Sequence, residues 1–279
     1  MILIADSGST KTDWVLTSGD GQMAHSQKTE GINPFHQSED EIRRILGGLI
    51  FEADVVIDAV FFYGSGVRPE LRPTMKRLLS ECLHVPAEHV EAESDLLGAA
   101  RALCGRGEGI ACILGTGANS CLYDGQQIRQ NTPALGYILG DEGSGAVIGR
   151  NLLNSIYKGK LPVALRELFE QEYQLSMADV IARVYRQPLA NRWMASLTPF
   201  ITRHSEEYPE LSQLVVSCFR DFLASNVAPY QRPDLSVSAI GSIAWYFQTE
   251  LAHAASLECM RIGTIEQTPM AGMLRYHHQ

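Results

Sequence analysis

The sequence has 279 residues, of which 45% are hydrophobic and 20% are charged, and its formal net charge at pH 7 is -9. This composition is typical of a globular protein and excludes disordered, collagen-like and coiled-coil chains. With 23 lysines and arginines against 32 aspartates and glutamates, the chain lacks the cationic surplus that nucleic acids and anionic membranes attract. The length predicts roughly two domains, each able to bury its own core.

The apolar runs are short, and the cysteines are scattered. The longest runs, such as residues 55–63, fall far below the roughly 20 residues of a membrane-spanning helix. Residues 1–6 lack the basic region of a signal peptide. The six cysteines form no C-x-x-C pair and are typical of reduced core thiols rather than of a disulfide framework or a zinc site. We therefore expect a cytoplasmic protein with neither a nucleic-acid nor a membrane partner.

Two segments about 110 residues apart share one order of strand, small polar turn, strand and second turn. The first joins residues 2–5 to residues 14–16, and the second joins residues 110–114 to residues 121–123. Each is typical of a hairpin whose tight turn carries glycine and hydroxyl side chains. The match predicts a duplicated fold with one hairpin in each lobe, and a chance likeness between two hairpins remains the alternative.

Between the hairpins, strand and helix signals alternate, which favours a layered α/β lobe. Ser38 and Glu41 form a capping box for a helix to about residue 53, and Ser94 is a candidate N-cap for a helix over 95–103. The other elements expected here are a strand at 57–63, a helix at 72–83 and a strand at 90–93.

After the second hairpin, the pattern is mostly helical from residue 146 to about residue 228, interrupted by prolines. The remaining expected elements are a strand at 235–240, a helix at 243–255, a strand at 260–265 and a short helix at 270–276. We place the domain boundary near Arg106 and Gly107, with lobes of residues 1–107 and 108–279 and with the last helix free to pack back on the first lobe.

The turn of the first hairpin reads D-S-G-S-T-K-T over residues 6–12. Glycine lets backbone N–H groups approach an anion, hydroxyls add donors, and a carboxylate at a strand end can hold a hydrated Mg²⁺ beside phosphates. The pattern therefore predicts a cradle for a nucleoside triphosphate, with an ordinary polar turn as the alternative, and it is not a P-loop. The candidate residues are Asp6, Ser7, Gly8, Ser9, Thr10, Lys11 and Thr12. A second turn of the same kind contains Gly115, Thr116 and Gly117.

Three further segments carry candidate chemistry. Asp95 begins a helix, where it could serve as a general base or could simply interact with the helix dipole. Asp141 and Glu142 stand between glycines and could accept hydrogen bonds from vicinal sugar hydroxyls, or they could belong to a solvated loop before a helix. Gly241 and Ser242, between a strand and a helix, would let a base or ribose lie near the backbone.

Together these segments resemble the superfamily of sugar kinases and ATPases that includes actin, hexokinase and the large heat-shock chaperones. They are most similar to its N-acetylglucosamine kinase branch, which also contains the activator ATPases of benzoyl-CoA reductase and hydroxyacyl-CoA dehydratase. Residues 6–12 resemble the first phosphate motif, with Ser7 and Ser9 in place of two glycines, and residues 114–120 resemble the second. Residues 140–144 resemble the sugar-site segment G-D-E-G-S, and residues 240–243 the adenosine motif.

The resemblance implies an α/β fold of two ribonuclease-H-like, actin-like ATPase lobes around a nucleotide cleft, with a large helical insertion in the second lobe. It implies ATP and Mg²⁺ as cofactors, Asp95 as the catalytic base and Asp6 as the partner of Mg²⁺. Thr10 and Thr116 would contact the phosphates. The residues implied for the sugar site are Asn33, Gly136, Asp141 and Glu142.

The implied reaction is phosphorylation of an amino sugar, with N-acetylglucosamine and its 6-hydroxyl as the first choice. Because Pro34 and Phe35 follow Asn33, the aromatic contact that often flanks the acetamido group is not carried over. The alternatives are an activator ATPase of the benzoyl-CoA reductase type and a non-catalytic sugar-binding regulator. The resemblance is also compatible with a homodimer.

Overall fold

The structure is a computed structural model that describes residues 1–8, 10–19, 21–52 and 55–278. The chain divides into two units. The first comprises Met1–Glu108, Tyr123–Ile128 and Thr268–Gln279, and the second comprises Gly109–Leu122 and Arg129–Gln267. The sequence suggested a division near residue 107 with the last helix free to pack on the first lobe, and in the structure Tyr123–Ile128 and Thr268–Gln279 group with the first unit.

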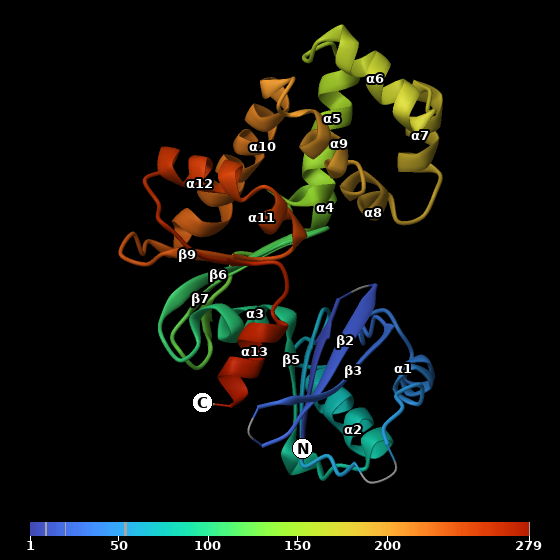
Figure 1. Cartoon of the computed structure of the whole chain (residues 1–279), viewed down its shortest axis with the longest axis vertical. Helices are drawn as coiled ribbons and strands as arrows, with labels where there is room; N and C mark the ends of the chain where they lie inside the picture. Colours follow the sequence, from blue (N-terminus) through green and yellow to red (C-terminus); the bar gives the residue numbers. More distant parts are fainter. Residues whose placement is uncertain (9, 20, 53–54, 279) are drawn as a thin grey trace. The chain divides into compact units, whose positions relative to one another are not determined.

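The first unit contains a five-stranded sheet, as far as the described residues show, in the order β3-β2-β1-β4-β5. β1 pairs antiparallel with β2 and parallel with β4, and β5 continues the parallel part. Helices α1 and α2 cover one face, and α3 and α13 cover the other (Figure 1). The elements are β1 Ile2–Ser7, β2 Lys11–Thr17, β3 Met23–Glu30, α1 Glu39–Leu46, β4 Ala59–Gly64, α2 Arg72–Leu83, the 3₁₀ turn Ala87–His89, β5 Val90–Ser94, α3 Asp95–Cys104 and α13 Met270–His277.

Most of these elements follow the sequence prediction, and two differences have a physical cause. The capping box of Ser38 and Glu41 is confirmed, but α1 ends at Leu46 because Gly47 and Gly48 follow. Strand β3 was not predicted, and residues 29–30, expected in a loop, belong to it. β3 is an edge strand whose side chains are mostly exposed, so it has no apolar alternation to mark it.

Close helix packing on the α3 face depends on two glycines. A β-carbon added at Gly98 of α3 would lie 2.7 Å from the Tyr63 ring and 2.8 Å from the Met273 methyl group. One added at Gly272 of α13 would lie 2.3 Å from the carbonyl oxygen of Ala102. Hydrogen alone fits at both positions, so α13 lies directly against the helix that begins with Asp95.

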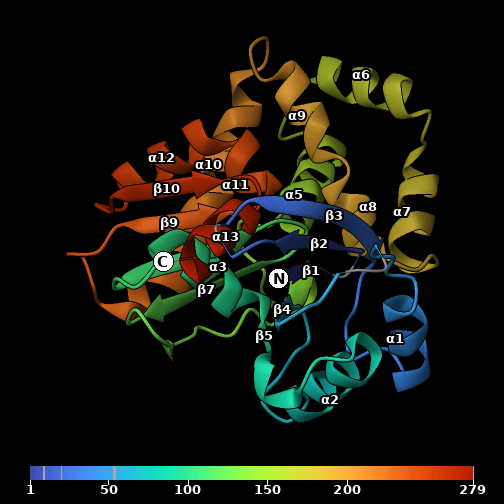
Figure 2. The same cartoon turned by 60° about the horizontal axis from the view of Figure 1, so that its bottom comes forward.

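The second unit repeats the sheet topology of the first. Its sheet has the order β10-β9-β6-β7-β8, so in both units the third, second, first, fourth and fifth strands of the unit follow one another across the sheet. Figure 2 shows β9 and β10 of this sheet side by side. The predicted α/β fold with an internal duplication is therefore confirmed. The strands are β6 Gly109–Leu114, β7 Ala118–Tyr123, β8 Ile128–Gln130, β9 Val237–Ile240 and β10 Ile262–Glu266.

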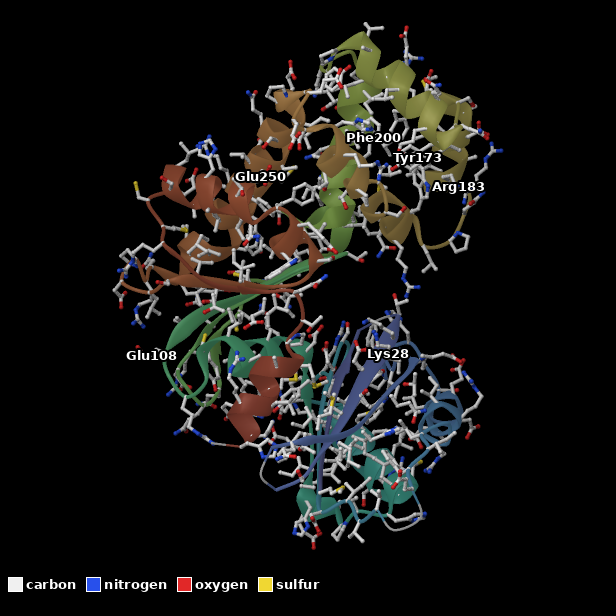
Figure 3. All side chains as sticks on the ribbon, viewed as in Figure 1. Lys28, Glu108, Tyr173, Arg183, Phe200 and Glu250 are labelled. Carbon is white, nitrogen blue, oxygen red and sulfur yellow. The ribbon has the colours of Figure 1, made fainter. Side chains whose placement is uncertain are left out.

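The helical insertion of the second unit shares one hydrophobic core with the sheet of that unit. In this core Phe200 lies edge-on to Phe169 and beside Tyr173, and Figure 3 labels Phe200 and Tyr173. Prolines begin helices here instead of ending them: Pro199 stands in the first turn of α9, and Pro209 is the first residue of α10. Among the described residues, no helix combines the length and hydropathy needed to span a membrane. The helices are α4 Gly136–Leu139, α5 Gly145–Tyr157, α6 Val163–Tyr173, α7 Met177–Tyr185, α8 Ala190–Ala195, α9 Thr198–His204, α10 Pro209–Phe222, the π-helix Leu223–Val227, the 3₁₀ turn Ala228–Tyr230, α11 Ser242–Tyr246 and α12 Gln248–Leu257.

Candidate active site

In the first unit, the candidate residues gather where parallel strands end. Asp6 of β1 lies opposite Tyr63 of β4, which lies opposite Glu93 of β5, and the next residues along the strands continue this register. Asp95 follows the last residue of β5, so it stands at the same carboxyl edge as Asp6. In open α/β sheets this edge is the usual position of a ligand site.

The end of α3 that carries Asp95 is built by local hydrogen bonds. The Ser94 hydroxyl accepts from Leu97 N–H at 3.2 Å, which confirms the predicted N-cap. Asp95 Oδ1 accepts from Leu96 N–H at 2.8 Å. Burial raises the pKa of Asp95, and the hydrogen bond from Leu96 opposes that rise. The carboxylate therefore has a fixed orientation and greater basicity than an exposed aspartate.

The pKa of Asp6, at the same edge, is also raised. Burial raises the pKa of Asp6 to about 7, with smaller contributions in the same direction from Asp95 and Asp13 and an opposing one from Lys11. Neighbouring carboxylates repel each other when no cation lies among them, so this charge distribution fits a divalent cation at Asp6. The described residues contain no cluster of three His, Cys, Asp or Glu side chains that could hold a metal by themselves. Mg²⁺ uses one or two carboxylates and completes its shell with water and phosphate oxygens.

The first turn is held in place by two of its hydroxyls. Ser7 and Thr12 are fully buried, and their side-chain oxygens lie 2.6 Å apart across β1 and β2. Ser7 Oγ accepts from Ile32 N–H at 2.9 Å, and Thr12 Oγ1 donates to the Glu30 carbonyl at 3.1 Å. Both residues are candidates for nucleotide contact, and in the structure their hydroxyls fix the base of the turn.

The tip of the turn is accessible. Gly8, Thr10 and Lys11 are exposed, and Gly8 N–H donates to the Lys11 carbonyl at 3.0 Å. Ser9, also predicted to contact the nucleotide, lies outside the described residues. The tip therefore presents a backbone loop, a hydroxyl and an ammonium group to a ligand.

Asn33 shapes its own loop. Its side-chain oxygen accepts from Phe35 N–H at 3.0 Å, and its N–H donates to Gln37 Oε1 at 2.7 Å. Gly66, at φ +78°, makes room for it, since a β-carbon there would lie 2.0 Å from the Asn33 oxygen. Asn33 therefore forms this turn, and the hydrogen bonds fix where its side-chain amide stands.

In the second unit, the second turn is bonded to the start of α5. Gly145 N–H donates to the Gly115 carbonyl at 2.8 Å, and Ala146 N–H donates to the Thr116 carbonyl at 3.2 Å. Thr116 is exposed at the tip. The segment that resembles the sugar site and the turn that resembles the phosphate site are therefore one structural unit.

Asp141 lies directly beside this turn. A β-carbon on Gly117 would be 3.1 Å from Asp141 Oδ2, so only glycine leaves full room for the carboxylate. Burial raises the pKa of Asp141, and Glu142 adds to the rise, while a hydrogen bond from Ala118 N–H opposes it. Gly136, the remaining residue predicted for the sugar site, is exposed at the start of α4, and its carbonyl accepts from Gly140 N–H at 2.8 Å.

Gly241 and Ser242 join the same cluster. Gly241 has φ +126°, and a β-carbon there would lie 2.2 Å from the Leu114 carbonyl oxygen. Glycine thus allows the turn after β9 to touch the turn after β6, and Ser242 is exposed beside it. The predicted adenosine segment and the second phosphate turn are adjacent within this unit.

Sequence reasoning missed Asn226, which sits in the π-helix after α10. Its Nδ2 donates to Glu142 Oε2 at 3.2 Å. The widened turn leaves its backbone carbonyl pointing outward, where it accepts from Ser120 Oγ at 3.1 Å and from Thr132 Oγ1 at 2.9 Å. Asn226 is 4% exposed, so it connects Glu142 to β7 from inside the protein.

The whole fold matches solved structures. A candidate N-acetylglucosamine kinase from Porphyromonas gingivalis is 47% identical, with a TM-score of 0.93 over 100% of this chain and 99% of that one. The chain belongs to this N-acetylglucosamine kinase family. A second candidate N-acetylglucosamine kinase, from Chromobacterium violaceum, is 18% identical with a TM-score of 0.73 over 99% of this chain and 98% of that one, a likeness that concerns the fold.

A curated relative agrees with this family. The N-acetyl-D-glucosamine kinase of Dictyostelium discoideum is 23% identical over 234 residues, which are 76% of this chain and 73% of that protein. No family model matches the sequence. The fold class expected from the motifs, that of the actin-like ATPases, is therefore confirmed by the match to the solved family member as well.

Proposed function

We propose that the protein is an ATP-dependent kinase that phosphorylates N-acetylglucosamine on its 6-hydroxyl. The observation that carries the proposal is the placement of Asp95 and Asp6 at one carboxyl edge, with coupled charges, in a chain of the N-acetylglucosamine kinase family. One carboxylate is suited to accept a proton, and the other to hold a cation beside phosphates.

In the proposed reaction, Asp95 accepts the proton of the sugar hydroxyl while its oxygen attacks the γ-phosphorus. The new O–P bond forms as the bond from the γ-phosphorus to the β-phosphate oxygen breaks, and that electron pair leaves with ADP. The raised pKa of Asp95 favours this step, since a base works best when its pKa approaches the operating pH. The chain contributes mainly by positioning and by neutralising charge.

Asp6 would hold Mg²⁺, which when bound neutralises charge on the phosphate oxygens. In the first unit, the Gly8 backbone, Thr10 and Lys11 at the exposed tip would contact phosphates. In the second unit, Gly115, Thr116 and Gly117 would do the same, with Gly241 and Ser242 against the adenosine. The residues assigned to the sugar are Asn33, Gly136, Asp141 and Glu142.

The test is ADP release from MgATP across a panel of N-acetylglucosamine, glucosamine, glucose and N-acetylmannosamine. We expect release that depends on sugar and is fastest with N-acetylglucosamine, with the phosphate recovered on the 6-oxygen. Faster release with plain glucose would refute the acetamido preference. ADP release that no sugar stimulates would refute the kinase itself.

The two other candidate functions have less support. An activator ATPase needs thiolates placed together to hold an iron-sulfur cluster. The six cysteines are scattered along the sequence without a C-x-x-C pair, and three of them are buried. Anaerobically purified protein should therefore contain no iron. A non-catalytic regulator would bind the sugar without releasing ADP, so the same panel separates it from a kinase.

A further inference from the structure

The first unit contains a cavity of about 390 Å³ beside the phosphate turn. Its volume lies in the range of small-molecule sites. It includes Asp6 and Lys11, which the proposed function already uses, and Lys28, to which it gives no role. The lining residues are Asp6, Lys11, Asp13, Trp14, Val15, Ser26, Gln27, Lys28, Thr268 and Met270.

Lys28 stands in one row with Asp6 across three strands. Asp6 of β1 lies opposite Asp13 of β2, and Asp13 lies opposite Lys28 of β3. Residues opposite each other in a sheet point to the same face, and strands are spaced by about 4.8 Å, so the row from Asp6 to Lys28 spans about 10 Å. Figure 3 shows Lys28 on the β2–β3 ribbon.

At the Lys28 end of this row, two ammonium groups share the single carboxylate of Asp13. Lys11 Nζ lies 2.7 Å from Asp13 Oδ2, and Lys28 Nζ lies 3.6 Å from Asp13 Oδ1. The Lys28 side chain is 72% exposed. Exposed ion pairs contribute little to stability, so Lys28 can leave Asp13 for an anionic ligand at small cost.

The strand order decides which part of a nucleotide would reach Lys28. Asp95 follows β5 and Lys28 lies on β3, so Asp6 stands between them. Asp95, as the general base, must lie beside the sugar hydroxyl that attacks the γ-phosphate. The opposite side of Asp6 therefore belongs to the leaving group.

We propose that Lys28 binds the β-phosphate of the nucleotide and stabilises the charge that develops there as ADP leaves. The inference rests on the proposed kinase function. When the bond between the γ-phosphorus and the bridging oxygen breaks, its electron pair stays on the β-phosphate, and an ammonium group there lowers the barrier. Asp13 holds the Lys28 ammonium in the cavity until the nucleotide arrives.

The test compares Lys28→Met with Lys28→Arg, using calorimetric binding of ADP, ATP and AMP together with steady-state kinetics. A charge-assisted contact predicts that Lys28→Met weakens ADP and ATP binding alike by about tenfold or more and lowers kcat. AMP binding and the KM for the sugar should not change, and Lys28→Arg should retain most of the ADP affinity. Lys158→Met is the matched control, since Lys158 is an exposed lysine at the far end of α5 in the other unit.

Equal ADP affinity in wild type and Lys28→Met, with thermal unfolding unchanged, would overturn the proposal. Loss of ATP affinity alone would also overturn it, because that result places Lys28 at the γ-phosphate. Failure of the kinase function is a separate result: wild-type protein would release no ADP with any sugar. Binding of ADP to the two variants would still decide the role of Lys28 in that case.

Discussion

Replacing Asp95 by asparagine separates proton transfer from every other role of this side chain. Asparagine has the same shape, and its side-chain oxygen can still accept the hydrogen bond from Leu96 N–H that Asp95 Oδ1 accepts at 2.8 Å. The Ser94 cap, which bonds Leu97 N–H, does not involve Asp95 at all. The variant should therefore fold normally and bind the sugar, and lose only the ability to take a proton.

The expected loss can be estimated from the role. A positioned general base contributes about 10²- to 10⁴-fold to a rate, so Asp95→Asn should raise the barrier by about 3 to 5 kcal/mol. The structure adds a second signature, because the charge of Asp95 helps to raise the pKa of Asp6. With that charge removed, the pKa of Asp6 should fall below about 7, and thermal stability should be unchanged or higher.

The assay is steady-state ADP release with N-acetylglucosamine and MgATP, with thermal unfolding measured on the same samples. Asp40→Asn is the control, because Asp40 is also an acidic residue in the first turn of a helix, α1, away from the site. We expect kcat to change less than about twofold in this control. A kcat near the wild-type value in Asp95→Asn would refute the assignment of Asp95 as the base. If that variant also unfolded at a lower temperature, Asp95 would serve only to stabilise its helix.

Three further changes test other parts of the structure. Asn226→Leu removes the amide that donates to Glu142 Oε2, so the sugar KM in steady-state kinetics should rise by roughly 3- to 10-fold with little change in kcat. Gly241→Ala forces a β-carbon into a backbone with φ +126° and 2.2 Å from a carbonyl oxygen, and urea unfolding should reveal a loss of at least about 1 to 3 kcal/mol. Burial lowers the pKa of His277, whose Nε2 lies 2.8 Å from Tyr63 Oη, to about 3. The unfolded chain therefore binds a proton that the folded chain resists, so the free energy of unfolding falls as the pH drops from about 6.5 toward 3. In His277→Gln, the difference between the free energies of unfolding measured at pH 7 and at pH 5 should be smaller.

Local capping signals were sufficient to place the starts of α1 and α3 in the first unit. Ser38 with Glu41, and Ser94 before Asp95, each bond to backbone groups within three residues, so the sequence contains both partners. The same holds for the two glycine-rich turns, whose recurrence about 110 residues apart predicted the duplication that the two sheet orders confirm.

Asn226 could not be found in this way. Its partner Glu142 is 84 residues away, and the π-helix that holds it has no apolar period of its own. One extra residue in a helical turn changes which carbonyl lacks an intrahelical partner, and the sequence does not mark that register. Long-range polar pairs of this kind become visible only when the chain is folded.

The alternation of side chains along a strand explains which candidate residues of the first turn face the core. Successive side chains in a strand point to opposite faces, so Ser7 shares the face of Leu3 and Ala5, which pack in the core. Asp6 points to the other face, where the register across β2 and β3 adds Asp13 and then Lys28. Residue types near a glycine turn were enough to nominate candidates, since hydroxyls and carboxylates both suit phosphate chemistry. Assigning each residue to the core or to the ligand also requires the strand boundaries and the register across β1, β2 and β3, and the sequence pattern did not reveal β3.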